Sequence, residues 1–127
     1  MKLLVDTHVL IWWLFDRPEL GDQGRAYLSD RSNDILYSVA SPWEMAIKIG
    51  QGKLEINIAD AIRSFTGAGF RRLDVDPAHL VTLVALARLH GDPFDRMIVA
   101  QALCTGLTIM TTDSAIQRYP VQTIGCR

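Results

Sequence analysis

Short apolar segments alternate with stretches of helical character along this chain, and this alternation limits the folds open to it. Residues 2–5 and 34–39 are the clearest short segments, rich in Leu, Val, Ile and Tyr. Runs that are apolar at successive positions are typical of strands buried on both faces of a sheet. Segments 71–75, 107–111 and 121–124 are predicted as three further strands. Strands separated by helices predict an α/β fold with a mainly parallel central sheet.

A capping side chain followed by proline marks three predicted helix starts, Ser41-Pro42, Asp76-Pro77 and Asp92-Pro93. Proline is favoured at the first helical position because its missing N–H would have no partner inside the helix. Three glycines are predicted to end helices, because glycine enters the left-handed conformation at little cost; they are Gly52, Gly91 and Gly106.

Length and composition favour one folded domain over residues 1–127. Hydrophobic residues make up 49% of the chain and charged residues 21%, with no linker-like segment. The longest apolar run, residues 9–15, has seven residues, whereas a membrane-spanning helix needs roughly 20. Cys104 and Cys126 are not spaced like the cysteines of metal or redox sites. We therefore expect a protein of the reducing cytoplasm without a membrane segment.

The predicted helix over residues 7–15 is apolar nearly all round. Its adjacent Trp12 and Trp13 cannot point in the same direction, so more than one flat sheet must cover this helix. Two interpretations stay open. The helix is either deeply buried within the chain or partly buried in an interface with a partner.

Four acidic residues stand at predicted helix starts. Asp6 precedes the first helix, and Asp113 precedes a short helix near the C-terminus. Glu44 follows Ser41 by three positions, and Asp95 follows Asp92 by three, which is the spacing of a capping box. Capping is therefore a sufficient local explanation for each of these acids taken singly.

The predicted topology brings these acids together. Asp6, Glu44 and Asp113 each follow a strand, and the carboxyl ends of parallel strands form the edge of the sheet where ligands bind. Asp95 begins a helix that follows another helix, so this rule does not place it. Two unit charges 4 Å apart repel by roughly 4 kcal/mol at an effective dielectric constant near 20, whereas one cap contributes only about 1 kcal/mol. Capping alone does not justify such a cluster.

A bound divalent cation would stabilise a cluster of four carboxylates. A set of oxygen ligands without cysteine or a histidine pair suits Mg²⁺ or Mn²⁺ better than Zn²⁺. Such an ion activates water and neutralises charge on a phosphoryl group, which indicates phosphodiester hydrolysis. The net charge of −1 becomes +3 when the four acids are left out, and ten of the thirteen basic residues are arginine, which suits phosphate.

For several other side chains, a structural and a functional interpretation both stay open. Thr7 either orients a ligand water or merely begins a helix, and Lys48 pairs with Glu44 or contacts a substrate phosphate. Asp92 is expected to be a cap, with a supporting acid as the alternative. Arg96 is within reach of a phosphate or a carboxylate, and the pair Arg71-Arg72 protects a sheet edge or follows a nucleic acid. We assign no catalytic role to the histidines, His8, His79 and His90.

Four ordered motifs carry a resemblance that spans almost the whole chain. They are LLVDTHVLIW with Asp6, SPWEMAIKIGQGKL with Glu44, DPFDRMIVAQA with Asp95 and TIMTTD with Asp113. The chain resembles the PIN-domain ribonucleases, specifically the VapC-type toxins of bacterial toxin–antitoxin pairs. The resemblance implies a three-layer α/β/α domain, a Mg²⁺- or Mn²⁺-dependent endoribonuclease that cleaves RNA, a homodimer, and a cognate antitoxin whose tail blocks the acidic groove. It also implies that Asp6, Glu44, Asp95 and Asp113 hold the metal or its waters.

Two rival functions belong to other classes. A non-catalytic module could use the same fold to bind nucleic acid or protein, but a binder of polyanions gains nothing from a negative edge unless cations fill it. A small-molecule phosphatase could use the same metal. The chain, however, lacks the Asp-x-Asp nucleophile motif of the common aspartyl-phosphate enzymes.

Overall fold

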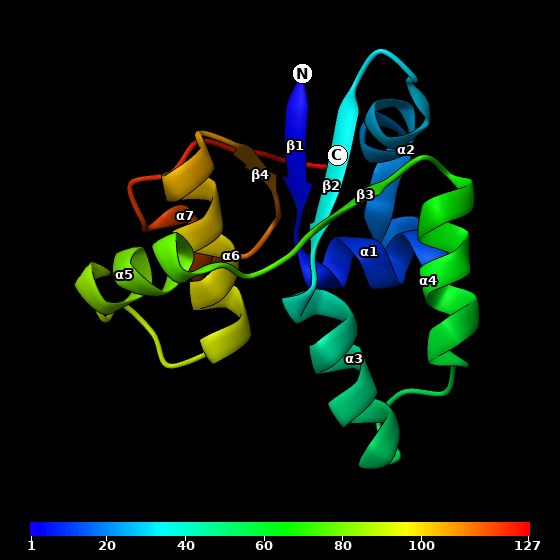
Figure 1. The fold of residues 1–127 in the computed structure, drawn as a ribbon. Helices are drawn as coiled ribbons and strands as arrows, with labels where there is room; N and C mark the ends of the chain where they lie inside the picture. Colours follow the sequence, from blue (N-terminus) through cyan, green and yellow to red (C-terminus); the bar gives the residue numbers. More distant parts are fainter.

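The computed structural model describes residues 1–127, with a five-stranded sheet in which every neighbouring pair is parallel. The strand order is β3-β2-β1-β4-β5. The central strand β1 (Lys2–Val5) lies between β2 (Asp34–Ser38) and β4 (Thr108–Met110), while β3 (Arg71–Leu73) and β5 (Thr123–Ile124) form the edges. The predicted α/β class with a parallel sheet is confirmed (Figure 1).

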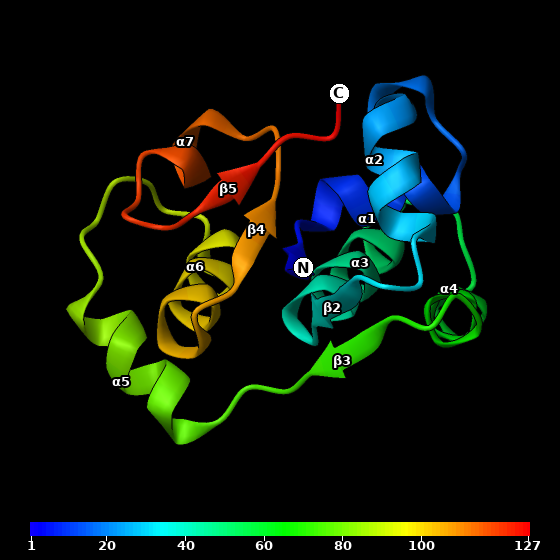
Figure 2. The same cartoon turned by 90° about the horizontal axis from the view of Figure 1, so that it is seen from above.

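Helices cover both faces of this sheet, which gives the three-layer α/β/α arrangement (Figure 2). The first layer contains α1 (Thr7–Leu14), the short 3₁₀ helix η1 (Pro18–Leu20), α2 (Gly21–Ser29), α3 (Ala40–Gly50) and α4 (Ile58–Gly67). The second layer contains α5 (Pro77–Ala85), α6 (Pro93–Thr105) and α7 (Ser114–Gln117).

The two faces of β1 supply two separate hydrophobic clusters. Leu3 and Val5 belong to the cluster on the α1–α4 side, whereas Leu4 belongs to the cluster on the α6–α7 side. All three side chains are fully buried. Because successive side chains of a strand point to opposite faces, a central strand with helices on both sides must be apolar throughout. This requirement explains the uninterrupted apolar run at the start of the chain.

The edge strands are shorter than predicted. The third strand was expected over residues 71–75, but β3 ends at Leu73, which pairs with Ser38, the last residue of β2. An edge strand has one neighbour, so its ladder stops where that neighbour stops. The segment predicted at 121–124 contracts to β5 for the same reason, since β5 pairs only with Ile109 and Met110. The inner strand β4 is also shorter than the predicted 107–111, because its ladder with β1 spans only Thr108–Met110.

Helix starts and stops are confirmed in part. Asp76 and Asp92 cap α5 and α6 through their side chains, and Gly106 ends α6 with a φ of 69°. The cap predicted at Ser41 is wrong, because α3 begins two residues earlier than this cap requires, and its N-cap, Val39, has no side-chain bond. The stop predicted at Gly91 is also wrong. Helix α5 ends at Ala85, and an extended connection separates it from Gly91.

Helix α1 is only partly buried in the first layer, because just Thr7, Val9 and Leu10 are buried. Trp12 and Trp13 are half-buried and pack against the cluster on the α1–α4 side, with the Trp13 ring 4.8 Å from that of Phe70. The chain therefore covers one side of this helix, and both interpretations of the segment stay open. No helix in the structure is both long and apolar enough to cross a membrane.

The C-terminal tail returns from β5 to α2. The buried Cys126 accepts a backbone hydrogen bond of 2.8 Å from the Gly24 N–H. A Cβ atom at position 24 would lie 2.7 Å from the Cβ of Cys126, so only glycine permits this approach. Cys126 is a free thiol, as is the exposed Cys104.

The aromatic packing of the first layer provides a test of the core. Phe65 is fully buried, with its ring centroid 4.8 Å from that of Tyr37. Phe65→Ala should lower the free energy of unfolding by about 3–5 kcal/mol in urea denaturation, because the cavity collapses only partly. The matched control Phe15→Ala removes a ring that is 43% exposed and should cost roughly 1 kcal/mol or less. Equal losses for the two variants would contradict this account of the core.

Candidate functional site

Asp6 lies at the carboxyl end of the central strand β1 and is almost completely buried. Its Oδ2 accepts a hydrogen bond of 2.8 Å from the Thr111 hydroxyl, while its Oδ1 is buried without a partner. Asp6 directly precedes α1, yet its side chain makes no capping bond to that helix. The capping explanation therefore fails here, and the carboxylate has one oxygen free for another ligand.

Glu44 lies one turn inside α3, and its side chain is also buried. Its Oε2 is 3.0 Å from the ammonium nitrogen of Lys48, and its Oε1 has no hydrogen-bond partner. The predicted capping box with Ser41 is wrong. The Ser41 hydroxyl instead shares a 2.8 Å hydrogen bond with the hydroxyl of Thr7, which ties the start of α3 to the start of α1.

Asp95 occupies the first turn of α6 and is buried. Asp92 caps this helix by accepting from the N–H groups of Phe94 and Asp95, so the cap expected at Asp92 is confirmed. Burial, and then the negative charges of four other carboxylates, raise the pKa of Asp95 to about 8; those carboxylates are Asp6, Asp92, Asp113 and Glu44. Asp95 thus lies within electrostatic reach of all the other acids.

Asp113 caps the short helix α7, as expected. Its Oδ1 accepts from the N–H groups of Ala115 at 2.7 Å and Ile116 at 3.2 Å. The Thr111 hydroxyl accepts a bond of 3.0 Å from the Asp113 N–H and donates to Asp6, so one side chain links the two acids. Burial raises the pKa of Asp6, and the Asp113 carboxylate raises it further.

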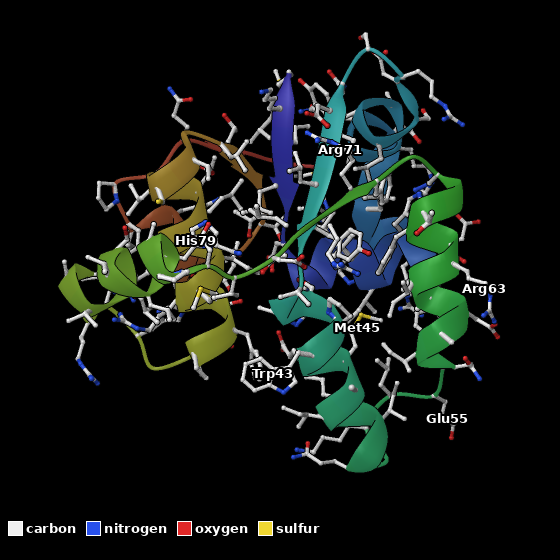
Figure 3. The ribbon with its side chains drawn as sticks, in the orientation of Figure 1. Trp43, Met45, Glu55, Arg63, Arg71 and His79 are labelled. Carbon is white, nitrogen blue, oxygen red and sulfur yellow. The ribbon has the colours of Figure 1, made fainter.

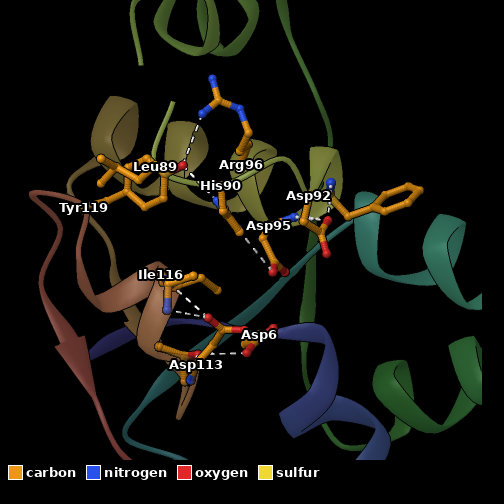
Figure 4. A network of polar contacts seen from close by, with 12 residues as sticks. Asp6, Leu89, His90, Asp92, Asp95, Arg96, Asp113, Ile116 and Tyr119 are labelled. Atoms are coloured by element: carbon orange, nitrogen blue, oxygen red, sulfur yellow. Dashed lines mark hydrogen bonds and ion pairs between the residues drawn. The ribbon is translucent and has the colours of Figure 1, made fainter. Parts of the chain in front are cut away.

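The acids therefore gather at the carboxyl edge of the sheet (Figure 4). The side chains of Asp6, Asp92, Asp95 and Asp113 point toward one shared region between α6 and the end of β1. Glu44 exerts the weakest of the four effects on Asp95. The structure thus brings Asp6, Asp95 and Asp113 together with Asp92. Glu44 lies within electrostatic reach of Asp95 and is paired with Lys48.

These residues fit a hard divalent cation. No three acidic, histidine or cysteine side chains are already arranged to hold a metal ion. However, the buried oxygens Asp6 Oδ1 and Glu44 Oε1 lack partners, and a buried acceptor left unpaired costs roughly 1–3 kcal/mol. A cation would satisfy these oxygens and relieve the repulsion that raises the pKa of Asp95. Carboxylate oxygens are the ligands preferred by Mg²⁺ and Mn²⁺.

Two contacts at the site were not anticipated from the sequence. His90, which was given no role, places its Nε2 3.6 Å from Asp95 Oδ2 while its Nδ1 lies 2.9 Å from the Tyr119 hydroxyl. Thr111 stands two residues before Asp113, and its hydroxyl contact with Asp6 spans 105 positions of sequence. The position of Thr111 at the end of a strand was the one available signal. His90 gave no such signal in the sequence, because its position near Asp95 depends on the path of the loop before α6.

The remaining basic residues are placed as follows. Lys48 forms the ion pair with Glu44. Arg96 contacts no carboxylate and donates instead to the Ala87 carbonyl and the Tyr119 hydroxyl. Arg71 and Arg72 on the edge strand β3 are paired with acids, which favours their role at the sheet edge.

Comparison with known proteins finds relatives over nearly the full length. A family model described as the PIN domain matches residues 3–122. Ribonuclease VapC22 of Mycobacterium tuberculosis is 25% identical over 121 residues, which cover 92% of this chain and 91% of that protein.

Solved structures share the fold. VapBC2 from Rickettsia felis, bound to a DNA fragment from its promoter, superposes with a TM-score of 0.78 at 15% identity and covers 98% of each chain. A toxin–antitoxin complex from Klebsiella pneumoniae superposes with a TM-score of 0.67 at 20% identity, again over 98% of each chain. At these identities the likeness is one of architecture.

The raised pKa of Asp95 gives a prediction about pH. Its folded-state pKa of about 8 exceeds the ordinary value of 3.8, so between roughly pH 4 and 8 the folded protein binds a proton that the unfolded chain releases. The free energy of unfolding therefore falls as pH rises through this window. Asp95→Asn removes that loss, so in EDTA its melting temperature should exceed that of the wild type by several degrees at pH 8 and by less at pH 5.

Differential scanning fluorimetry at the two pH values measures this difference. Asp60→Asn serves as the control, because the Asp60 side chain is 63% exposed and distant from the cluster. An Asp95→Asn advantage that is the same at both pH values would show that Asp95 is ionised in the folded protein.

Proposed function

Because this chain belongs to the PIN domain family, we propose that it is a metal-dependent endoribonuclease and acts as the toxin of a toxin–antitoxin pair. The relative in Mycobacterium tuberculosis is a ribonuclease, and the architecture is shared with toxin–antitoxin complexes. RNA is then the substrate and a cognate antitoxin the protein partner. Both belong to the cytoplasm, which is where we place this protein.

One observation supports the proposal: the carboxylates of Asp6 after β1, Asp95 on α6 and Asp113 before α7 gather at one edge of the sheet, and the buried Glu44 on α3 acts electrostatically on Asp95. Their mutual repulsion opposes folding, so a ligand that offsets it is needed. Bound Mg²⁺ or Mn²⁺ would lower the pKa of a water molecule and neutralise charge on the phosphoryl group that is attacked.

In this proposal each side chain of the site has a defined role in binding the metal ion. Asp6, Glu44 and Asp95 would hold the ion through their buried oxygens. Asp113 uses Oδ1 as a cap, which leaves Oδ2 for the ion or one of its waters. Thr111 orients Asp6 by its hydrogen bond to Oδ2, so the unpartnered Oδ1 faces the ligand.

A non-catalytic binding module remains the alternative from a different class. It explains the fold but gives no reason for burying several carboxylates beside one another, since a negative edge repels nucleic acid. The enzyme accounts for these acids directly.

RNA cleavage tests the proposal. The purified wild-type protein should cleave single-stranded RNA with MgCl₂ or MnCl₂ and lose this activity in EDTA. Asp6→Asn and Asp95→Asn should each lower the rate at least roughly 100-fold, because even indirect support of a metal site is worth 10- to 100-fold. Gel analysis of a labelled RNA measures the rate, and circular dichroism checks that the variants stay folded.

Asp60→Asn again supplies the matched control and should cleave like the wild type, because this exposed carboxylate pairs only with Arg63 on α4. Full activity of the wild type in EDTA would reject the metal-dependent mechanism and favour either another chemistry or the binding module.

A homodimer also forms part of the proposal. Helix α5 exposes Leu80 and Val81, whose exposed fractions are 48% and 73%. Neighbouring apolar side chains left in solvent are typical of surfaces that bind a partner. Val81→Asp should therefore convert a dimer of the wild type to a monomer in sedimentation experiments, without a change in circular dichroism. A monomeric wild type would remove the homodimer from the proposal.

A further inference from the structure

The arginines of this protein divide into two groups. Five of the ten form ion pairs with acids: Arg17, Arg25, Arg63, Arg71 and Arg72. Of the five others, three gather around the connection between α5 and α6. Arg88 lies within this connection, Arg96 donates to the carbonyls of Leu86 and Ala87, and Arg118 donates to the carbonyl of Leu89. Positive charge without a paired acid is thus concentrated in one place.

A cavity of about 410 Å³ lies at this place, and Arg88, His90 and Arg96 form its polar wall. No acidic side chain lines it, and Leu83 and Val84 supply an apolar wall. Arg88 is exposed and takes part in no hydrogen bond or ion pair in the structure. The cavity therefore offers a guanidinium group with all of its donors free.

The second guanidinium is held in position without being neutralised. Arg96 Nη1 donates to the Ala87 carbonyl at 2.8 Å and to the Tyr119 hydroxyl at 3.1 Å. Its Nη2 donates to the Leu86 carbonyl at 3.3 Å. These acceptors are uncharged, so they fix the group and leave its full charge on the cavity wall. Arginine held in this way suits phosphate oxygens.

The cavity adjoins the acidic site. His90 lines the cavity, and its Nε2 lies 3.6 Å from Asp95 Oδ2 (Figure 4). One side chain thus forms the boundary between a wall with positive charge and a cluster of carboxylates. A nucleic-acid strand whose phosphate is cleaved at the carboxylates would extend past this boundary.

We propose that this cavity binds a backbone phosphate of single-stranded RNA, next to the phosphodiester bond at the acidic site. The proposal rests on the proposed function and extends it, because it names the group that holds the substrate strand. An anionic strand that approaches a cluster of carboxylates needs compensating cations beside it. Arg88 and Arg96 supply these cations, and the half-buried Leu83 offers an apolar contact to a ribose or a base.

Arg88→Ala tests the proposal with little risk to the fold, since this side chain has no partner in the structure. The matched control is Arg63→Ala on α4, where Arg63 points away from the sheet (Figure 3). Fluorescence anisotropy in EDTA measures the binding of a fluorescein-labelled single-stranded RNA of random sequence. A second assay measures cleavage of the same RNA in MgCl₂.

We expect Arg88→Ala to weaken RNA binding roughly tenfold, as for the loss of one charge-assisted contact. The slope of log K against log salt concentration should fall by about 0.7, which corresponds to one phosphate on a single strand. Arg88→Lys should restore the slope, because it restores the charge. Arg63→Ala should change neither affinity nor slope.

The two assays separate the failure of this proposal from the failure of the proposed function. If Arg88→Ala binds RNA like the wild type, the cavity proposal is overturned, whatever the cleavage result. If binding depends on Arg88 but no metal supports cleavage, the cavity stands and the nuclease is rejected. Absence of RNA binding by the wild type overturns the cavity proposal. A polyglutamate peptide whose binding alone depends on Arg88 would assign the cavity to an acidic protein segment instead.

Discussion

The position of β1 at the centre of the parallel sheet determines where three of the four predicted acids lie, Asp6, Glu44 and Asp113. β1 pairs with β2 on one side and β4 on the other, so the carboxyl ends of all three strands meet at one edge. Asp6 follows β1 directly, α3 follows β2, and Thr111 follows β4. A shift in any of these pairings would separate side chains that are 34 or more positions apart in sequence yet share hydrogen bonds, such as Thr7 with Ser41 and Thr111 with Asp6.

The acids are placed there at a cost to the folded state. Asp6, Glu44 and Asp95 are buried, and two of their oxygens have no partner. Several other charges are paired, as Asp34 is with Arg71 and Asp60 with Arg63. Around the start of α6, by contrast, unpaired carboxylates lie close to Arg88 in the preceding connection and to Arg96 in the first turn of the helix. Proteins keep such unfavourable arrangements where a ligand offsets them.

The sequence predicts well those helices, strands and caps that depend on the residues immediately around them. The central strands were recognised because burial on both faces demands an unbroken apolar run. The caps at Asp76 and Asp92 were recognised because each carboxylate accepts from backbone N–H groups two and three residues later. Prediction failed where a residue distant in the sequence determines a contact or the end of an element. The hydroxyl of Ser41 is occupied by Thr7 rather than by its own helix, β3 ends where β2 ends, and the loop before α6 carries His90 to Asp95. Asp6, Glu44 and Asp113 could be proposed as a group because strand topology is itself a consequence of local pattern, whereas the assignment of Asp95 depended on the resemblance to the PIN-domain ribonucleases.

The contact between the C-terminal tail and α2 has a consequence for folding. The space above Gly24 is filled by Cys126, which comes from the opposite end of the sequence. The hydrogen bond that orients the carboxylate of Asp6 likewise comes from Thr111, 105 positions away. Contacts between residues so distant in sequence form slowly, because a long loop must close before they can be made. The acidic edge is therefore expected to be completed late in folding, after the local helices have formed.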